Sequence, residues 1–383
     1  MRFLGALLTA PIAAIAAPIL EPRGEALPRK WIAVLKPESV AENVLGSVTS
    51  ILGGVAPRHT YKLGGFRGYS ISASESLVKS IADLADIAYI EPDYKVSIAS
   101  FTSQSAAPWG LARLSSREPN ATDYNYDASA GEDTFVYVID TGIAVDHPEF
   151  EGRAKLGTSF VEGNTNDEHG HGTHVAGTIG SLTYGVAKKT NLIAVKVLGA
   201  DGSGAISQVI AGIQWAVEDA TSKKRIGKAV GNISLGALRL LSSSVNTAAA
   251  AAVEAGLFLA VAAGNGNVDA SQYTPASEPT VCTVGATDPS DERAVFSNYG
   301  SLVDVFAPGV GVVSTWNNGS VATLSGTSMA TPHVAGLAAY LMRLEGPRDP
   351  GALCERIQEL ATPDVIANSR SSHNLLAFNG NVE

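Results

Sequence analysis

The sequence predicts an α/β protein with a largely parallel sheet and helices on both faces, preceded by a small α+β domain. In the large C-terminal part, short apolar runs of strand length show no alternation, and helix-period segments lie between several of them. Strands that are buried on both faces, as in a parallel sheet between two helix layers, have this appearance. The pattern changes near residue 100, which separates the two parts.

The first residues, MRFLGALLTAPIAAIAAP, predict a signal peptide over residues 1–17. One arginine precedes an apolar run, and Ala14 and Ala16 have the spacing of a signal-peptidase site. A membrane anchor is the alternative, but the run is shorter than the roughly 20 residues of a spanning helix and Pro11 interrupts it. We therefore expect a secreted, extracellular protein without a membrane partner.

Residues 21–100 alternate between extended segments and the helix-like segments 39–52 and 76–87, which indicates a small α+β domain. A polar stretch, SFTSQSAAP, follows at residues 100–108, and we expect it to be structureless and easily cleaved. The expected domains are residues 18–104 and residues 105–383.

Six apolar runs predict the strands of the large domain: residues 135–139, 191–198, 232–235, 257–263, 281–286 and 302–308. Two helix-like segments, SQVIAGIQWAVEDA and SSSVNTAAAAAVEAG, open with serines that predict caps at Ser207 and Ser242. In such a sheet, functional groups gather where the strands end at their carboxyl edge.

The charge distribution narrows the choice of partners. Lys and Arg number 10 against 9 Asp and Glu in residues 1–101, and 17 against 28 in residues 102–383. An acidic surface repels phosphate backbones, which disfavours nucleic-acid binding. The only two cysteines, Cys282 and Cys354, would pair in an oxidising compartment, and two free buried thiols are the alternative.

Two motifs place reactive groups at the ends of predicted elements. Asp140 ends the run FVYVID, where a half-shielded carboxylate can orient an imidazole; a turn-capping aspartate is the alternative. Ser328, in GTSMATPHVAG, opens a helix whose N-terminal N–H groups can face a developing anion; a simple N-cap is the alternative. His333 of the same motif is expected to be a hydrogen-bonded packing residue.

The stretch HGHGTHVAG places His169, His171 and His174 within six residues of one another. A zinc site would need a fourth ligand and a closed geometry, whereas glycines on both sides of His171 favour the close approach of another chain. With Asp140 and Ser328 elsewhere, His171 is interpreted as a general base. His174 is expected in the packed interior and His169 in solvent.

Asn265 follows the run LFLAVAAG at the end of another predicted strand. Its side chain could donate to the oxyanion of a tetrahedral intermediate, beside the backbone N–H of Ser328. The alternative is a turn asparagine in the left-handed conformation.

The motifs DTG, HGTHVAG and GTSMATPHVAG, in this order, together with PWGLAR, HPEFEGR, PASEPTVCTVGA and FSNYGS, resemble the subtilisin-like serine proteases (peptidase S8), of the fungal proteinase K type. The resemblance implies a serine endopeptidase that acts through Asp140, His171 and Ser328 and an acyl-enzyme, without a catalytic cofactor. A catalytically silent, peptide-binding pseudoprotease is the alternative. Residues 31–99, which end in IEPDYKV, resemble the ferredoxin-like inhibitory propeptide of this family (inhibitor I9). They imply a zymogen that cuts itself near residues 100–106.

The resemblance also implies how substrate binds. An extended peptide would pair with two edges that let chains approach closely, and an apolar pocket would favour aliphatic or aromatic residues before the scissile bond. The residues concerned are Gly202, Ser203 and Gly204 on one edge, Ser234, Leu235 and Gly236 on the other, and Ala262 and Gly264 at the pocket. The segment ALRLL after Gly236 departs from the family pattern.

Further implications of the resemblance concern stability. A structural calcium ion would be held by the carbonyls of Pro279 and Val281 and by Asp304, with a plain surface carboxylate as the alternative at Asp304. Cys282 and Cys354 match a family disulfide. The expected partners are protein or peptide substrates and the chain's own propeptide, and the expected state is a monomer.

Two N-x-S/T sequons, at Asn120 and Asn318, fall in expected loops and are predicted glycosylation sites. A third, at Asn232, lies on a predicted strand at the substrate edge and is not expected to be modified.

Overall fold

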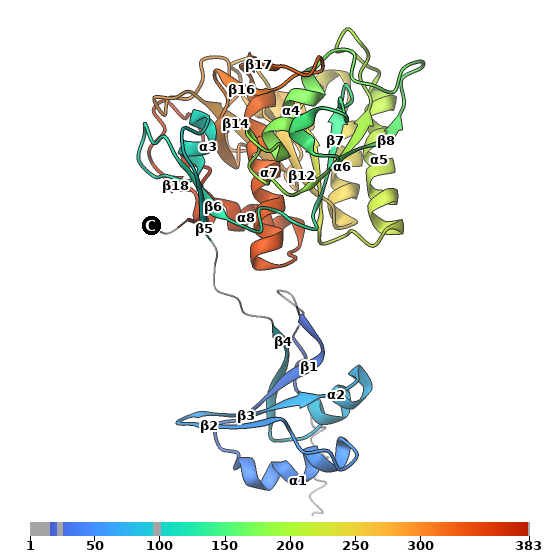
Figure 1. The fold of residues 1–383 in the computed structure, drawn as a ribbon, viewed down its shortest axis with the longest axis vertical. Helices are drawn as coiled ribbons and strands as arrows, with labels where there is room; N and C mark the ends of the chain where they lie inside the picture. Colours follow the sequence, from blue (N-terminus) through green and yellow to red (C-terminus); the bar gives the residue numbers. More distant parts are fainter. Residues whose placement is uncertain (1–15, 21–25, 95–100, 382–383) are drawn as a thin grey trace, which may run out of the picture. The chain divides into compact units, whose positions relative to one another are not determined.

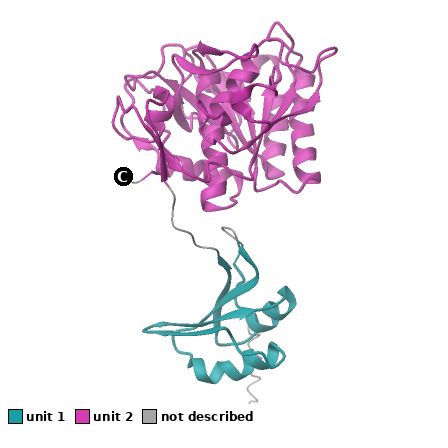
Figure 2. Cartoon of the chain, viewed as in Figure 1, with its two compact units in different colours: residues 1–97 teal, residues 98–383 magenta. Residues whose placement is uncertain are grey.

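The computed structural model describes residues 16–20, 26–94 and 101–381, so nearly all of the predicted signal peptide lies outside the described residues. The chain forms two compact units, residues 1–97 and 98–383 (Figure 2). Each unit has its own hydrophobic core.

The first unit is a four-stranded antiparallel sheet with two helices, in the strand order β2-β3-β1-β4 (Figure 1). Its elements are β1 (Ala26–Leu35), α1 (Ala41–Ile51), β2 (His59–Leu63), β3 (Phe66–Ser72), α2 (Glu75–Ala82) and β4 (Ile87–Tyr94). Val44 and Val48 of α1 and Val78 and Ile81 of α2 lie one turn apart, so each helix buries one apolar stripe in the core with the sheet. This is the predicted ferredoxin-like arrangement.

The second unit is built on a nine-stranded sheet in the order β18-β19-β15-β14-β12-β10-β7-β9-β8. Its strands are β7 (Phe135–Asp140), β8 (Ala154–Ser159), β9 (Asn191–Lys196), β10 (Ala229–Ile233), β12 (Phe258–Ala262), β14 (Cys282–Thr287), β15 (Val305–Pro308), β18 (Thr362–Pro363) and β19 (Leu375–Leu376). Every neighbouring pair is parallel except β18 with β19.

Helices cover both faces of this sheet (Figure 1), which confirms the predicted fold class. The helices are α3 (Trp109–Leu114), α4 (His171–Gly180), α5 (Ile206–Ser222), α6 (Ser244–Glu254), α7 (Thr327–Glu345) and α8 (Pro350–Leu360). Residues of α4 and α7 pack in one core, and residues of α5 and α6 pack in the other. Helix α7 is buried along most of its length, because its residues are small or apolar nearly all round.

Shorter elements complete the second unit. Three two-stranded ladders join β5 (Phe101–Gln104) to β6 (Tyr124–Asp127), β11 (Ala237–Leu238) to β13 (Tyr273–Thr274), and β16 (Val312–Thr315) to β17 (Val321–Leu324). Single 3₁₀ turns are η1 (Pro148–Phe150), η2 (Arg239–Leu241) and η3 (Ala270–Gln272).

In the described part of the polar stretch, residues 101–108, the chain is not structureless as predicted. Phe101–Gln104 forms β5, and the Gln104 side chain donates to the Thr183 carbonyl at 3.0 Å. The two units separate at residues 97 and 98, so residues 101–104 belong structurally to the second unit although they were predicted to belong to the first. Backbone pairing with β6, which the side chains do not reveal, holds this segment in place.

The two predicted serine caps are wrong. Helix α5 begins at Ile206, before Ser207, and the Gln208 side chain accepts the N–H of Ala205 at 2.7 Å. Helix α6 follows Ser243, whose side chain makes no capping hydrogen bond. The strand predicted at 232–235 is also displaced, since β10 spans Ala229–Ile233.

The predicted disulfide between Cys282 and Cys354 is present and ties β14 to α8. In the part of the chain that the structure describes, no helix combines the length and apolarity needed to cross a membrane.

Candidate active site

Three of the predicted site residues lie at or just after the carboxyl ends of neighbouring strands. In the sheet, β7 is a neighbour of β10, and β10 is a neighbour of β12. Asp140 is the last residue of β7, Ser234 follows β10, and Asn265 comes shortly after β12. Because these strands are parallel, their ends meet at one edge of the sheet.

Asp140 and His171 are hydrogen-bonded. His171 is the first residue of α4, and its Nδ1 donates to Asp140 Oδ1 at 2.8 Å. The Asp140 carboxylate is fully buried and also accepts the N–H of Thr141 at 2.7 Å, whereas one fifth of the His171 side chain is exposed. A proton held on Nδ1 leaves Nε2 as the acceptor.

Burial alone would lower the pKa of the His171 imidazole, but the charge and the hydrogen bond of Asp140 outweigh it. The pKa of His171 is therefore raised above its ordinary value. The buried carboxylate thus favours the protonated ring that a general base becomes during the reaction.

Asp167, which was not singled out from the sequence, fixes the turn that carries His171. Its Oδ1 accepts Thr141 Oγ1 at 2.8 Å and the N–H groups of Gly170 at 2.8 Å and His169 at 3.1 Å. Its Oδ2 accepts the N–H of Thr173 at 2.9 Å and the Thr173 hydroxyl at 2.6 Å. Asp167 thereby joins the start of α4 to the residue after Asp140.

The sequence contained a weak signal for Asp167. Aspartate and threonine side chains commonly bond the free N–H groups of turns and helix starts, and Asp167 and Thr173 flank the Gly170–Gly172 turn. A lone aspartate in a polar loop has no periodicity to mark it, so the sequence pattern does not predict the role of Asp167.

The other histidines have structural partners. His174 is fully buried and its Nε2 donates to the Val312 carbonyl at 3.1 Å; burial lowers its pKa to about 4. His333 is buried and donates to the Met329 carbonyl at 2.9 Å, and burial likewise lowers its pKa to about 4. Both predictions are confirmed. His169 is half-buried rather than solvated, and its Nδ1 accepts the N–H of His171 at 3.3 Å.

The zinc alternative finds no support in this arrangement. Within residues 16–20, 26–94 and 101–381, the only group of three His, Cys, Asp or Glu side chains with ligand atoms close together is Cys282, Asp304 and Cys354. The histidines of HGHGTHVAG therefore do not form a metal-binding group with other side chains of the described chain.

Ser328 is the second residue of α7, directly after the Gly326 cap and Thr327. Its hydroxyl donates to the Ser234 carbonyl at 2.9 Å, and the Ser234 hydroxyl donates to the Ser328 carbonyl at 3.0 Å. Ser234 and His171 line the same hollow, of about 310 Å³. The Ser328 hydroxyl thus contacts Ser234, a residue that lines the same hollow as His171. In this structure its hydrogen bond goes to the Ser234 carbonyl.

Asn265 is held next to Ser328 by Thr327. Its Oδ1 accepts the N–H of Thr327 at 2.8 Å and the Thr327 hydroxyl at 2.9 Å. Since both bonds use the oxygen, the Nδ2 donor of this exposed side chain is not engaged by Thr327. The left-handed residues of this turn are Gly264 and Asn267, so the alternative of a left-handed Asn265 is excluded.

The two predicted substrate edges face each other across an apolar hollow of about 300 Å³. The edges contribute Gly202, Ser203 and Gly204 on one side and Leu235, Gly236 and Ala237 on the other; the remaining lining is Leu198, Ile206, Val209, Val245 and Thr274. A Cβ at Gly204 would collide with the Val197 carbonyl, so this close approach requires glycine. Ala262 is buried at the end of β12, and Gly264 donates to Thr327 Oγ1 at 3.2 Å; neither lines this hollow.

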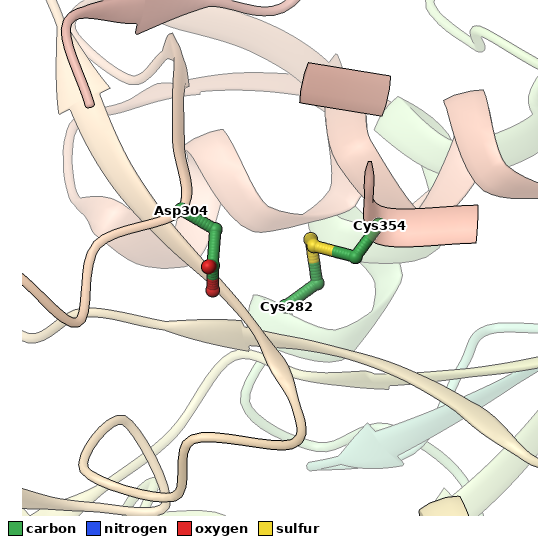
Figure 3. Close-up of side chains that lie close together, drawn as sticks. All are labelled: Cys282, Asp304 and Cys354. Carbon is green, nitrogen blue, oxygen red and sulfur yellow. A yellow bond between two sulfur atoms is a disulfide. The ribbon is translucent and has the colours of Figure 1, made fainter. Parts of the chain in front are cut away.

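Asp304, the predicted calcium ligand, lies beside the disulfide (Figure 3). Its carboxylate accepts the N–H of Thr283 at 2.8 Å and the Gln358 amide at 3.3 Å. Burial raises the pKa of the Asp304 carboxyl group to about 6. Pro279 and Val281 lie on the turn that leads into β14, two to four residues before Thr283.

The residues present suit a hard cation rather than a soft metal. Both sulfur atoms near Asp304 belong to the disulfide and offer no thiolate. A carboxylate and main-chain carbonyls are the oxygen ligands that calcium prefers. The surroundings of Asp304 are therefore compatible with the predicted ion.

Comparisons with known proteins agree with this geometry. Residues 131–360 match the subtilase family of peptidase S8, and residues 27–99 match peptidase inhibitor I9. The chain is 52% identical over 326 residues to the subtilisin-like serine protease AsES of Sarocladium strictum, covering 85% of this chain and 83% of that protein. It is 48% identical over 364 residues to Proteinase R of Parengyodontium album, covering 95% and 92%.

A solved structure of a cold-adapted subtilisin-like serine proteinase superposes with a TM-score of 0.69 at 41% identity, covering 73% of this chain and all of that one. The family match spans more than half of the chain, and the two relatives are covered over more than four fifths of their own length. The chain therefore belongs to the subtilase family of serine proteases and carries an inhibitor I9 propeptide.

Proposed function

We propose that the protein is a secreted serine endopeptidase in which Ser328 is the nucleophile, His171 the general base and Asp140 the residue that orients His171. The observation that carries the proposal is the hydrogen bond between the buried Asp140 and His171. Ser234 lines the same hollow as His171, and its carbonyl accepts the hydroxyl of Ser328. Subtilases need no catalytic cofactor, and every group in this proposal belongs to the chain.

The reaction proceeds in two halves. Ser328 gives up its contact with the Ser234 carbonyl, passes its proton to Nε2 of His171 and attacks the scissile carbonyl carbon. Asn265 Nδ2 and the N–H of Ser328 stabilise the oxyanion, since the first N–H groups of α7 have no helical acceptor. His171 then protonates the leaving amine, and the peptide bond breaks to give an acyl-enzyme. Water, deprotonated by His171, hydrolyses the ester and restores Ser328.

An extended polypeptide is the substrate that the two edges favour. Strand-like pairing with residues 202–204 and 234–236 uses the backbone of the substrate and accepts many sequences. The apolar hollow between these edges supports a preference for aliphatic or aromatic side chains, with broad tolerance.

The remaining features concern maturation and stability. The inhibitor I9 unit blocks the enzyme until the chain cuts itself near residues 100–106. A calcium ion is held by the carbonyls of Pro279 and Val281 and by Asp304. Glycans are carried by Asn120 and Asn318, which are exposed, whereas Asn232 is fully buried in β10.

Turnover of casein tests the proposal. We expect Ser328→Ala to abolish it, phenylmethylsulfonyl fluoride to block the wild type, and zinc chelators to have no effect on the rate. Ser290→Ala, an exposed serine on a turn, is the matched control and should remain active. Peptide binding without cleavage by the wild type would instead establish a pseudoprotease.

A further inference from the structure

His169 places a second imidazole in the hollow that contains His171, and the proposed reaction does not use it. Both histidines line this hollow, and their ring centroids lie 6.3 Å apart with an angle of 66° between the rings. The side chain of His169 is half-buried and in contact with solvent. Histidine is the side chain whose charge ordinarily changes between about pH 5 and 8. A proton taken up by His169 would therefore arrive directly beside the general base.

The neutral ring of His169 holds the backbone of His171. Its Nδ1 accepts the N–H of His171 at 3.3 Å, two residues along the chain. This N–H belongs to the first residue of α4 and has no acceptor within the helix. A neutral imidazole has one acceptor nitrogen, whereas the protonated ring donates from both nitrogens and accepts nothing. Protonation of His169 would thus break the hydrogen bond and set two donors against each other at the start of α4.

The backbone around His169 stays anchored when the ring changes its charge. The N–H of His169 donates to Asp167 Oδ1 at 3.1 Å, and the same oxygen accepts the N–H of Gly170 at 2.8 Å. Glu168, the other carboxylate next to His169 in the chain, is exposed. Within the described part of the chain, the hydrogen bond from the His171 N–H is the one that holds the ring, so the ring can turn once this bond is lost.

A carboxylate from another segment of the hollow offers the protonated ring a new partner. Asp201 and Gly202 line the hollow together with His169, and a Cβ on Gly202 would lie 3.0 Å from His169 Nε2. The pKa of the Asp201 carboxyl is lowered mainly by its hydrogen bonds with Ser203 and also by the charge of His169. A positive ring beside the Gly202 segment is therefore attracted towards Asp201.

We propose that His169 is a positioning residue for His171: its neutral ring holds the His171 backbone, and its protonated ring leaves His171 and pairs with Asp201. The inference rests on the proposed endopeptidase function, in which His171 is the general base. A proton on His171 blocks catalysis directly, and a proton on His169 blocks it by releasing the start of α4. The active enzyme needs both rings neutral, so acid switches it off more sharply than it would an enzyme with a single base.

The pH profile of kcat/KM for the wild type with one short peptide tests the proposal. On a logarithmic plot, the acidic limb should first follow His171 with a slope of about one, and then steepen to a slope of about two as His169 is protonated as well. One pH unit below the steepening, the second proton should lower kcat/KM by a further factor of about ten. Circular dichroism over the same range shows where the chain unfolds.

His169→Asn separates support of the backbone from titration. An asparagine Oδ1 can accept the N–H two residues further on, as the His169 ring does, but the amide does not take up a proton. We therefore expect kcat at high pH within about twofold of the wild type and a slope of about one along the whole acidic limb. His169→Leu removes the acceptor, so kcat should fall about tenfold at every pH. Asp201→Asn removes the charge that attracts the protonated ring, so the steepening should move to lower pH.

His147→Asn is the matched control. His147 Nδ1 accepts the N–H of Glu149, also two residues further on, at 3.2 Å, and His147 does not line the hollow that contains His171. This variant should keep the wild-type profile, including the steepening.

Three results overturn the inference alone. They are a wild-type limb with a slope of one down to the pH of unfolding, a steepening that coincides with unfolding, and a slope of two that persists in His169→Asn. Failure of the wild type to cleave any peptide overturns the proposed function as well.

Discussion

The imidazole of His171 joins two environments, a fully buried carboxylate on Nδ1 and a partly open hollow around the rest of the ring. The carboxylate raises the pKa of the ring, whereas burial opposes it. A base with a raised pKa takes up a proton more readily but is neutral only at higher pH. The charge and the hydrogen bond of Asp140 thus influence both the strength of the base and the pH range in which it acts.

The pH dependence of the wild type and of Asp140→Asn follows from this bond. Wild-type kcat/KM should rise with pH through a pKa above the ordinary histidine value of 6.5, because only neutral His171 accepts the proton. Asp140→Asn removes the charge that raises this pKa, so the rising limb should move to lower pH while kcat falls by about 10⁴. The test is to measure the pH profiles of kcat/KM of both proteins with one chromogenic peptide. A rising limb at the same pH in both proteins would contradict the role of Asp140 in raising the pKa of His171.

Asp167→Asn tests whether the turn before α4 positions His171. The amide loses the charge that draws five hydrogen bonds and also contributes to the raised pKa of His171. We expect kcat to fall about 10- to 100-fold with little change in KM, and the acidic limb to shift to lower pH. Asp146→Asn, at a nearby exposed position, is the control. A fall in thermal stability with an unshifted pH profile would show that Asp167 is merely structural.

At the scale of elements, the sequence predicted best the strands that are buried in the sheet. Apolar runs without alternation marked β7, β9, β12 and β14 to within about two residues, because strands between two helix layers must be apolar throughout. Strand β8, with the sequence AKLGTS, was missed because it lies at the edge of the sheet and its side chains are mostly exposed or half-buried. The serine cap predicted for α5 is wrong for a different reason: the Gln208 side chain accepts the N–H of Ala205 at the start of this helix.

In the candidate site too, the sequence predicted some features and missed others. Asp140, His171, Ser328 and Asn265 stood out because each follows a strand or opens a helix within a distinctive motif. The hydrogen bond of Ser328 to Ser234 and the bonds of Asp167 join residues far apart in the chain or within a patternless loop. Such contacts depend on side-chain placement after folding, so no local pattern encodes them.

Calcium should stabilise the region where β14, α8 and Asp304 meet. Excess EGTA is expected to lower the melting temperature of the wild type, because an ion at 100 times its Kd adds about 2.7 kcal/mol to the free energy of unfolding. Asp304→Asn should remove the calcium dependence of melting while peptide cleavage at low temperature is retained. Differential scanning calorimetry with and without EGTA provides the measurement. Unchanged wild-type melting in EGTA would count against an ion at Asp304.

At the scale of the whole molecule, the chain carries its inhibitor and its enzyme as two units with separate cores. Such a division suits a propeptide that is cut away, since each unit keeps its own apolar interior after the break. The acidic balance of residues 102–383 lies within the second unit.

Self-processing predicts a simple result on gels. The wild-type chain should separate into two fragments, whereas Ser328→Ala should remain a single chain because the nucleophile that cuts it is absent. Ser290→Ala should be processed as the wild type is. Electrophoresis of each variant after expression gives the answer, and fragments of wild-type size from purified Ser328→Ala would show that another protease makes the cut.

The ladder between β5 and β6 bears on how the free enzyme should be produced. A recombinant version that starts at Ser105 would lack Phe101–Gln104 and leave the backbone of Tyr124–Asp127 without its partner. An uncovered strand of this kind recruits other chains and promotes aggregation. Starting at Phe101 keeps that edge covered, so the choice of first residue should decide whether the preparation stays dispersed.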